Sequence, residues 1–355
     1  MTETFVAGVD GPVVIVTRSL KSLKLPHSLT PDAKIVALPN VVYGRNPVRH
    51  WRDVRKLAQL CSGALSFSVV GADMMDGGYG EVAAIRRAHM LTNVSRSGID
   101  ARLLGFSWNG HAPRKVQKAL AAAGRAGVKL LVRDPESLGR LEGAAVQGLQ
   151  ESADIVFCAD DRDESALEAV RKRLGGERPF VVLNASALVQ KRVNQVPDYL
   201  QIAKYFEGAG FSIVLVPHVL RASANDLDSC RKVMAAMDEA GVAGHLIEEQ
   251  LSPSQVRGIA AGASVVVTGR MHLAVMALGQ GVPAFVLSTQ GKVAGLAKMF
   301  EQPDLCVEPN LGFSSAVIDS LVPDPVQEIA RRQEAVRRAL PRVRELARKN
   351  FEGLI

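Results

Sequence analysis

Residues 263–283 read ASVVVTGRMHLAVMALGQGVP, and the order of their parts indicates the fold. The valine-rich run at 264–267 predicts a short strand that is buried on both faces, as in a parallel sheet. A small turn follows, and the apolar run from about Met271 predicts a helix. The segment 281–283 then leads into a second short apolar run at 284–287. Strand, turn, helix and strand in this order form the repeating unit of a parallel α/β domain.

Short apolar runs of this kind, separated by helical patterns, recur along the whole chain. A loose polar stretch at 171–179 divides them into two sets and predicts a linker. We therefore expect an α/β protein with two doubly wound, Rossmann-like domains, residues 1–175 and 176–323, whose strand-to-helix loops face a cleft. The predicted strands are 13–17, 35–38, 66–70, 102–104, 128–131 and 155–158 in the first domain, and 180–183, 213–216, 244–247, 264–267 and 284–287 in the second.

Residues 324–355 predict a long C-terminal helix, which we expect to pack back on the N-terminal domain. Asp324 and Pro325 are a capping residue and a favoured first helical residue, and Pro341 predicts a kink. One side of this helix is apolar. We interpret the other side as a solvated face, with contact to an anionic membrane as the alternative. That side carries Arg331, Arg332, Arg337, Arg338, Arg342, Arg344 and Arg348.

The composition is that of a globular protein, because 47% of the 355 residues are hydrophobic and 22% are charged. No apolar run reaches the length of a membrane-spanning helix and the start shows no targeting pattern, so we expect a cytoplasmic protein. The four cysteines lack metal-ligand spacing and are interpreted as reduced core thiols. The net charge of +7 favours a phosphorylated small molecule or an anionic lipid as partner. Nucleic acid is the weakest choice, because aromatic residues make up only 5% and no binding motif occurs.

An anion site is predicted where the strand at 264–267 ends. Arg270 and His272 follow that strand and stand at a helix N-terminus, whose unpaired N–H groups carry partial positive charge. Lys292 follows the next strand and returns to the same edge of the sheet. Arginine grips a carboxylate or phosphate with two hydrogen bonds, and lysine adds a mobile charge. The alternative is a structural arginine paired with a carboxylate and a histidine that caps the helix.

Further polar residues follow other predicted strands. Arg133 precedes Asp134-Pro135, a helix start, so it either contacts a ligand or pairs with Asp134. Asn184 could hydrogen-bond a substrate. His218 either faces that substrate or satisfies a core hydrogen bond. Asp73 and Asp76 could accept a proton from a sugar hydroxyl or bind a metal, but they stand beside two glycines and equally suit a turn. Asp161-Arg162-Asp163 resembles a metal motif, although helix capping explains it better.

These residues together resemble the polysaccharide pyruvyl transferase family. Members share a strand, an Arg-x-His motif at a helix start, a downstream Gly-x-Pro and a lysine about twenty positions after the histidine. The resemblance covers roughly residues 66–300. The matching motifs are Arg270-Met271-His272, Gly281-Val282-Pro283, Lys292, Arg133-Asp134-Pro135-Glu136-Ser137, Val216-Pro217-His218-Val219 with Asn225-Asp226, and Val70-Gly71-Ala72-Asp73.

The resemblance implies transfer of the enolpyruvyl unit of phosphoenolpyruvate to two hydroxyls of one sugar, which forms a pyruvyl ketal and releases phosphate. It implies His272 as the general acid, with Arg133 as the second catalytic residue. Arg270, Lys292 and Arg133 would neutralise the donor, and Asn184 and His218 would complete its site. Phosphoenolpyruvate is the co-substrate, and the scheme needs neither a metal nor another cofactor.

The start of the chain departs from the family pattern. Members have an Asn-x-Gly-Asp loop after the first strand, whereas residues 17–24 here read TRSLKSLK. This departure concerns the acceptor side, because the loop lies in the first domain. We expect Asp73, Ser107, Trp108 and Asn109 to contact the acceptor, with the Trp108 ring as a flat face for a sugar.

Two other functions suit the same pattern. Two facing doubly wound domains with a terminal helix are glycosyltransferase-B-like, so a nucleotide-sugar glycosyltransferase is the first alternative. A non-catalytic glycan-binding homologue is the second. In each case the expected partner is a glycan or a lipid-linked saccharide, and the protein would work in the cytoplasm, with peripheral membrane contact as an option.

Overall fold

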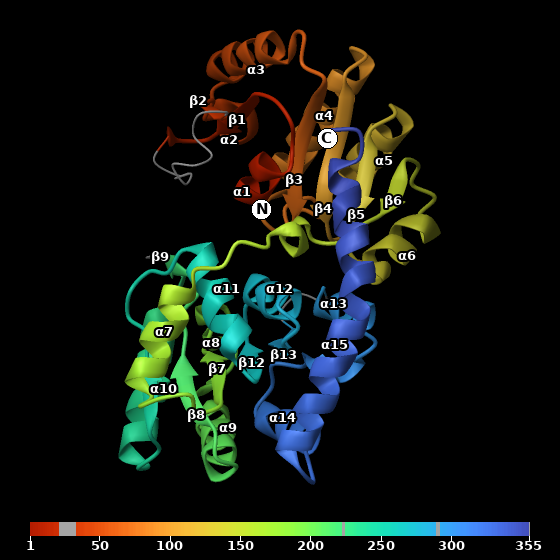
Figure 1. Cartoon of the computed structure of the whole chain (residues 1–355). Helices are drawn as coiled ribbons and strands as arrows, with labels where there is room; N and C mark the ends of the chain where they lie inside the picture. The colour runs from red at the N-terminus through yellow and green to blue at the C-terminus, as the bar shows by residue number, and fades with distance from the viewer. Residues whose placement is uncertain (21–32, 222–223, 289–291, 355) are drawn as a thin grey trace. The chain divides into compact units, whose positions relative to one another are not determined.

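The computed structural model describes residues 1–20, 33–221, 224–288 and 292–354 (Figure 1). The predicted loop at 17–24 and the predicted segment 288–292 therefore lie partly outside the described residues. The chain forms two compact units. Unit 1 comprises Met1–Ala159 and Val343–Ile355, and unit 2 comprises Asp160–Arg342.

Unit 1 is built on parallel strands. Its main sheet has the order β3-β4-β5-β6, and a parallel pair, β1-β2, precedes it in the chain. The strands are β1 (Val13–Thr17), β2 (Ala33–Ala37), β3 (Ser66–Ala72), β4 (Asp100–Phe106), β5 (Lys129–Val132) and β6 (Leu149–Glu151). The helices are α1 (Thr2–Ala7), α2 (Asn40–Tyr43), α3 (Pro47–Cys61), α4 (Glu81–Arg96), α5 (Arg114–Arg125), α6 (Pro135–Gly143) and the 3-10 helix η3 (Ile155–Cys158).

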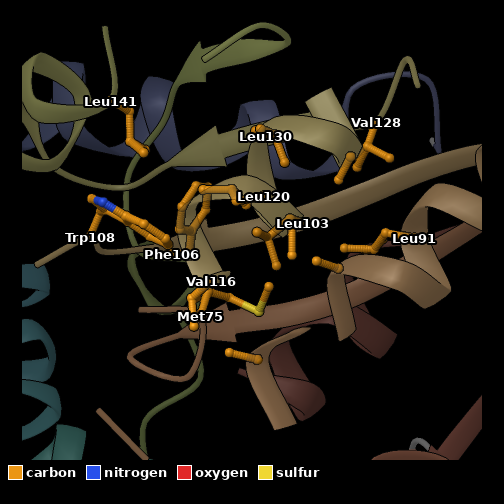
Figure 2. Close-up of a cluster of buried hydrophobic side chains, with 14 of the residues drawn as sticks. Met75, Leu91, Leu103, Phe106, Trp108, Val116, Leu120, Val128, Leu130 and Leu141 are labelled. Atoms are coloured by element: carbon orange, nitrogen blue, oxygen red, sulfur yellow. The ribbon is translucent and has the colours of Figure 1, made fainter. Parts of the chain in front are cut away.

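The core of unit 1 lies between this sheet and helices α4 and α5 (Figure 2). Leu103 and Phe106 project from β4, and Leu91 and Leu120 project from the two helices onto them. Trp108 is part of the same cluster. Burial of such side chains stabilises a fold by about 2 kcal/mol each, so this cluster holds the sheet edge that carries the polar residues of unit 1.

Unit 2 contains one six-stranded parallel sheet in the order β11-β8-β7-β12-β13-β14. The first strand, β7, is central: the chain builds outward on one side of it, then returns to add β12 on the other. The strands are β7 (Phe180–Asn184), β8 (Ser212–Leu215), β11 (Gly244–Leu246), β12 (Val265–Thr268), β13 (Ala284–Leu287) and β14 (Cys306–Val307), with a small antiparallel pair β9 (Leu220–Arg221) and β10 (Ala224–Asn225). The point between β7 and β12 is thus a topological switch point, where doubly wound sheets bind ligands.

The helices of unit 2 alternate with these strands as predicted for a doubly wound fold. They are α7 (Glu164–Arg173), α8 (Ala187–Gln190), α9 (Val196–Gly208), α10 (Asp226–Glu239), α11 (Pro253–Gly262), α12 (Met271–Gly279), α13 (Val293–Met299) and α14 (Phe313–Asp319). The α/β class with parallel sheets is therefore confirmed in both units.

Several details differ from the sequence prediction. Residues 155–158 form the 3-10 helix η3 instead of a strand, because Asp154 caps this turn by accepting a hydrogen bond from the Val156 N–H. The fourth strand of the sheet is β6, which was not predicted. The two units divide at Ala159, before α7, since α7 packs against α11 of unit 2. The polar stretch at 171–179 therefore lies within unit 2.

The predicted C-terminal helix is confirmed as α15 (Pro325–Arg348), with Asp324 accepting from the N–H groups of Val326 and Gln327. The residues of α15 from Val343 onward belong to unit 1. Just after the helix, the Asn350 side chain donates to the Ala153 carbonyl of the same unit at 3.0 Å. The assignment of Arg332 to a solvated face is wrong, because Arg332 is buried and pairs with Asp304. Among the helices of the described residues, none is both long and apolar enough to cross a membrane.

Candidate active site

The switch point of unit 2 is fixed by a buried amide. Asn184 ends β7, and its Nδ2 donates to the Val216 carbonyl at 2.9 Å while its Oδ1 accepts from the Thr268 hydroxyl at 2.9 Å. Three neighbouring strand ends are thereby tied together. Both polar atoms of the side chain are engaged inside the sheet, so the structure gives Asn184 a positioning role instead of the predicted donor contact.

The turn after β12 is held just as closely. The Thr268 hydroxyl accepts from the Arg270 N–H at 2.9 Å, which fixes the backbone where α12 begins. A Cβ at Gly269 would lie 2.6 Å from the Ser186 Cβ and 2.8 Å from a Val189 methyl carbon. Glycine is therefore required here by close packing, and the Thr-Gly turn presents Arg270 at the sheet edge.

A buried carboxylate fixes the orientation of the Arg270 side chain. Its Nε lies 3.0 Å from Asp226 Oδ2, and its Nη2 lies 2.6 Å from Asp226 Oδ1. Asp226 is fully buried and also accepts from the backbone N–H groups of Ala187 and Val219, both at 2.9 Å. The Arg270 side chain is only 15% exposed, and among the described residues its Nη1 has no partner. One face of a fixed cation is thus left for a ligand anion.

Two histidines stand beside this pair. His272 is the second residue of α12, and His218 follows β8, with its backbone N–H 3.4 Å from Asp226 Oδ2. The Nδ1 atom of His218 is buried and has no hydrogen-bond partner in the described part of the chain. Burial, together with the neighbouring His272 and Arg270, lowers the pKa of His218 to about 4 against the opposing effect of Asp226. His218 is therefore neutral near pH 7 and close to His272.

Lys292 completes the set of predicted donor residues. It is buried and directly precedes α13, which follows β13. Because β13 pairs in parallel with β12, the loops after the two strands leave the sheet at the same edge. Unit 2 therefore places Arg270, His272, His218 and Lys292 at one sheet edge, as the sequence predicted.

The depressed pKa of His218 predicts acid sensitivity. The unfolded state, with a histidine pKa near 6.5, binds the proton more readily than the folded state does between about pH 6.5 and pH 4. Stability should therefore be full above about pH 6.5 and fall as the pH drops toward 4, by up to about 3 kcal/mol. Urea unfolding of the wild type and of His218→Gln at pH 7 and pH 4.5 measures this. His111→Gln, at an exposed site, is the control. An unchanged pH slope in His218→Gln would contradict the prediction.

In unit 1, Arg133 is the centre of a buried polar network. Its Nη1 donates to Asp154 at 2.7 Å, its Nε donates to the Ser107 hydroxyl at 2.8 Å, and its Nη2 pairs with Asp73. Burial opposes the charge on Arg133, but the nearby carboxylates of Asp73 and Asp154 outweigh it and raise its pKa. Asp134 caps α6 as predicted, and it also accepts from the Ser107 hydroxyl, which in turn accepts from Arg133.

The predicted acceptor residues do not share one environment. Ser107 is buried in the Arg133 network, and Trp108, only 4% exposed, is packed into the core. The expectation that Trp108 offers a face to a sugar is therefore wrong for this structure, because its ring is buried in the core cluster, where it lies beside Phe106 (Figure 2). Asn109 accepts from the His111 N–H within a turn. The side chain of Asp73 remains 24% exposed and Asn109 is also partly exposed, so these are the members of the group that a ligand can reach.

The structure also shows the contacts of the other aspartates for which the sequence allowed two interpretations. Asp163 caps α7, and Asp161 pairs with Arg257, so capping and pairing explain the Asp-x-Asp sequence. Asp76 accepts from the Gly78 N–H and forms the turn. No group of side chains suited to a metal ion occurs among the described residues. The residues that sequence reasoning missed are Asp154 and the role of Asp226, which was quoted in a motif without a function.

Solved structures share this fold at low sequence identity. UDP-GlcNAc 2-epimerase from Neisseria meningitidis matches with a TM-score of 0.61 and 12% identity, over 97% of this chain and 90% of that one. The N-terminal domain of trehalose-6-phosphate phosphatase from Candida albicans gives 0.57 and 9%, over 99% and 92%. A UDP-forming trehalose-phosphate synthase from Burkholderia xenovorans gives 0.54 and 13%, over 98% and 93%. These similarities confirm a glycosyltransferase-B-like fold.

Sequence comparison identifies the family. Among curated proteins, none matches this chain by sequence. The family model for polysaccharide pyruvyl transferase matches residues 18–291, which is most of the chain and includes Arg133, Asp226, Arg270 and His272. The chain therefore belongs to the polysaccharide pyruvyl transferase family.

Proposed function

We propose that the protein transfers the enolpyruvyl unit of phosphoenolpyruvate to two hydroxyls of one sugar in a glycan precursor. A proton adds to the methylene carbon of the donor and makes it a methyl group. The two sugar hydroxyls lose their protons as their oxygens bond to the adjacent carbon, and the bond from that carbon to the phosphate oxygen breaks. One of the two protons replaces the one given to the methylene carbon, and the other leaves with the inorganic phosphate. The product is a cyclic ketal that keeps the carboxylate. The observation that carries this proposal is the fixed Arg270 beside His272 in a chain of this family.

The residues of unit 2 suit the donor. Nη1 of Arg270 has no partner among the described residues and would bind the carboxylate or phosphate, while Lys292 would supply a second positive charge. His272 would donate the proton to the methylene carbon, since imidazole can hold a proton near neutral pH. His218, which is neutral near pH 7, adds no like charge when His272 is protonated. The same groups would stabilise the negative charge on the departing phosphate.

Arg133 takes a different part in this proposal from the one its motif implies. Its three guanidinium nitrogens contact Ser107, Asp154 and Asp73 within unit 1. We therefore propose that Arg133 is a positioning residue, which holds the partly exposed Asp73 carboxylate for a sugar hydroxyl. The donor anion is assigned to Arg270 and Lys292.

A thermal-shift comparison tests the donor. Phosphoenolpyruvate should raise the melting temperature of the wild type, and Arg270→Gln should make the increase much smaller. Nucleotide sugars should give no comparable stabilisation through Arg270. The reverse pattern would support a nucleotide-sugar glycosyltransferase instead. Incubation with phosphoenolpyruvate and a panel of saccharides should then release phosphate and add a pyruvyl mass. Donor binding without any release would support the non-catalytic alternative.

A further inference from the structure

One buried arginine of unit 1 has no counter-ion among the described residues. Within the described residues, five arginines are buried: Arg87, Arg102, Arg133, Arg257 and Arg332. Four of them pair with a carboxylate, namely that of Asp100, Asp154, Asp161 or Asp304. Arg87 is the exception in this part of the chain, although it is only 7% exposed.

The contacts of Arg87 are with neutral groups. Its Nη2 donates to the Tyr43 hydroxyl at 2.6 Å, and its Nη1 lies 3.5 Å from the Met74 carbonyl oxygen. The Met74 sulfur is 3.7 Å from Nη2. A buried charge is costly unless an opposite charge compensates it. The other four buried arginines follow this rule, whereas no anion contacts Arg87 among the residues that the structure describes.

The surroundings of Arg87 are positive and reachable. The guanidinium of the exposed Arg18 lies 5.3 Å from the centre of the Tyr43 ring, and this ring is 46% exposed. Arg86 donates to the carbonyls of Val42 and Gly44, at 2.9 and 2.7 Å, and so holds Tyr43 in place. Two arginine side chains, one buried and one exposed, thus converge on a single tyrosine.

The position of this cluster in the fold suits a ligand. Arg18 follows β1, Tyr43 ends the helix that follows β2, and Met74 comes two residues after the end of β3. All three lie beyond the carboxyl ends of parallel strands, where α/β sheets bind ligands. Asp73, whose carboxylate is held by Arg133, directly precedes Met74. A cation cluster and a hydroxyl-binding carboxylate therefore belong to the same strand-end region.

We propose that Arg87, Arg18 and Tyr43 bind a phosphate group of the acceptor, which is a saccharide still attached to a phosphate or diphosphate carrier. Guanidinium groups bind phosphate oxygens through paired N–H donors, and the tyrosine hydroxyl adds a third donor. The carrier phosphate would supply the anion that Arg87 lacks, and the linked sugar could then reach Asp73. This assignment of the acceptor class rests on the proposed pyruvyl transfer, whereas the phosphate site itself does not.

Isothermal titration with inorganic pyrophosphate tests the site. The donor site is first disabled with Arg270→Gln, so that the remaining binding reports on unit 1. We expect the added Arg87→Gln change to weaken pyrophosphate binding about tenfold or more, with Arg87→Lys intermediate. Arg55→Gln is the matched control, because Arg55 also lies over an aromatic ring, that of the exposed Trp51. Equal affinity with and without Arg87→Gln would overturn the proposal.

Additional measurements distinguish a folding defect from a loss of binding, identify the type of carrier, and test donor binding separately. If Arg87→Gln loses its circular dichroism spectrum, the exposed Arg18→Gln takes its place, and unchanged binding in that variant also overturns the proposal. Displacement of pyrophosphate by uridine diphosphate or by geranyl diphosphate assigns a nucleotide or a lipid carrier, respectively. Stabilisation of the wild type and of Arg87→Gln by phosphoenolpyruvate is measured separately. Its absence would reject the proposed donor without affecting the phosphate site.

Discussion

Replacing His272 with alanine should lower the rate of phosphate release from phosphoenolpyruvate by about 10²- to 10⁴-fold, the usual contribution of a general acid. The expected cause is loss of the proton that the methylene carbon needs before the phosphate can leave. Phosphoenolpyruvate binding should change little, because Arg270 keeps its contacts with Asp226 in this variant. The rate is measured as inorganic phosphate released with an accepted sugar, and binding is measured by thermal shift.

The exposed His111 provides the control for this prediction. His111→Ala should retain both the rate and the donor-induced stabilisation. Full activity of His272→Ala would reject the role of His272 as the acid. Loss of donor binding together with activity would instead make His272 a binding residue, since an interaction made only in the transition state lowers the rate without weakening substrate binding.

The sequence predicted the fold well where local pattern determines structure. The valine-rich run, the small turn and the apolar helix of residues 263–283 correspond to β12, the Thr268-Gly269 turn and α12. Residues 155–158 show the limit of such reasoning. An apolar run of four residues is compatible with either a strand or a buried turn. Here the Asp154 side chain caps the run, which forms the 3-10 helix η3. The unit boundary also escaped prediction, because the packing of α7 against α11 is a tertiary contact.

The sequence predicted the positively charged residues of the candidate site, but it did not predict the carboxylates that pair with them. Arg270 and His272 follow from their place after a strand. Asp226, 44 residues earlier, pairs with Arg270 only because the sheet brings the loops after β8 and β12 together. For Arg133 the sequence offered the adjacent Asp134, whereas the structure supplies Asp73 and Asp154, which are 60 and 21 residues away. Residue spacing does not reveal such long-range pairs.

Asp226→Asn should be the most destabilising single change in unit 2 that keeps the size of a side chain. The carboxylate accepts from Arg270 and from three backbone N–H groups, those of Ala187, His218 and Val219, in a fully buried position. An amide presents N–H donors where acceptors are needed and leaves the guanidinium without its counter-charge. We expect a loss of about 3 kcal/mol in the free energy of unfolding, measured by urea denaturation. Asp228→Asn is the control, because Asp228 lies in the same first turn of α10 but is exposed.

A double-mutant cycle separates the ion pair from the backbone contacts of Asp226. If the pair aims Arg270 at the donor, Asp226→Asn should weaken phosphoenolpyruvate binding in the wild type but not in Arg270→Gln. The stability cost should also be smaller in that background, because no unpaired guanidinium remains, while the cost of the three backbone contacts persists. Equal effects on donor binding in both backgrounds would show that Asp226 stabilises the loops without orienting Arg270. A smaller effect in Arg270→Gln would mean that the carboxylate fixes the direction of the cation, and so leaves Nη1 for the donor.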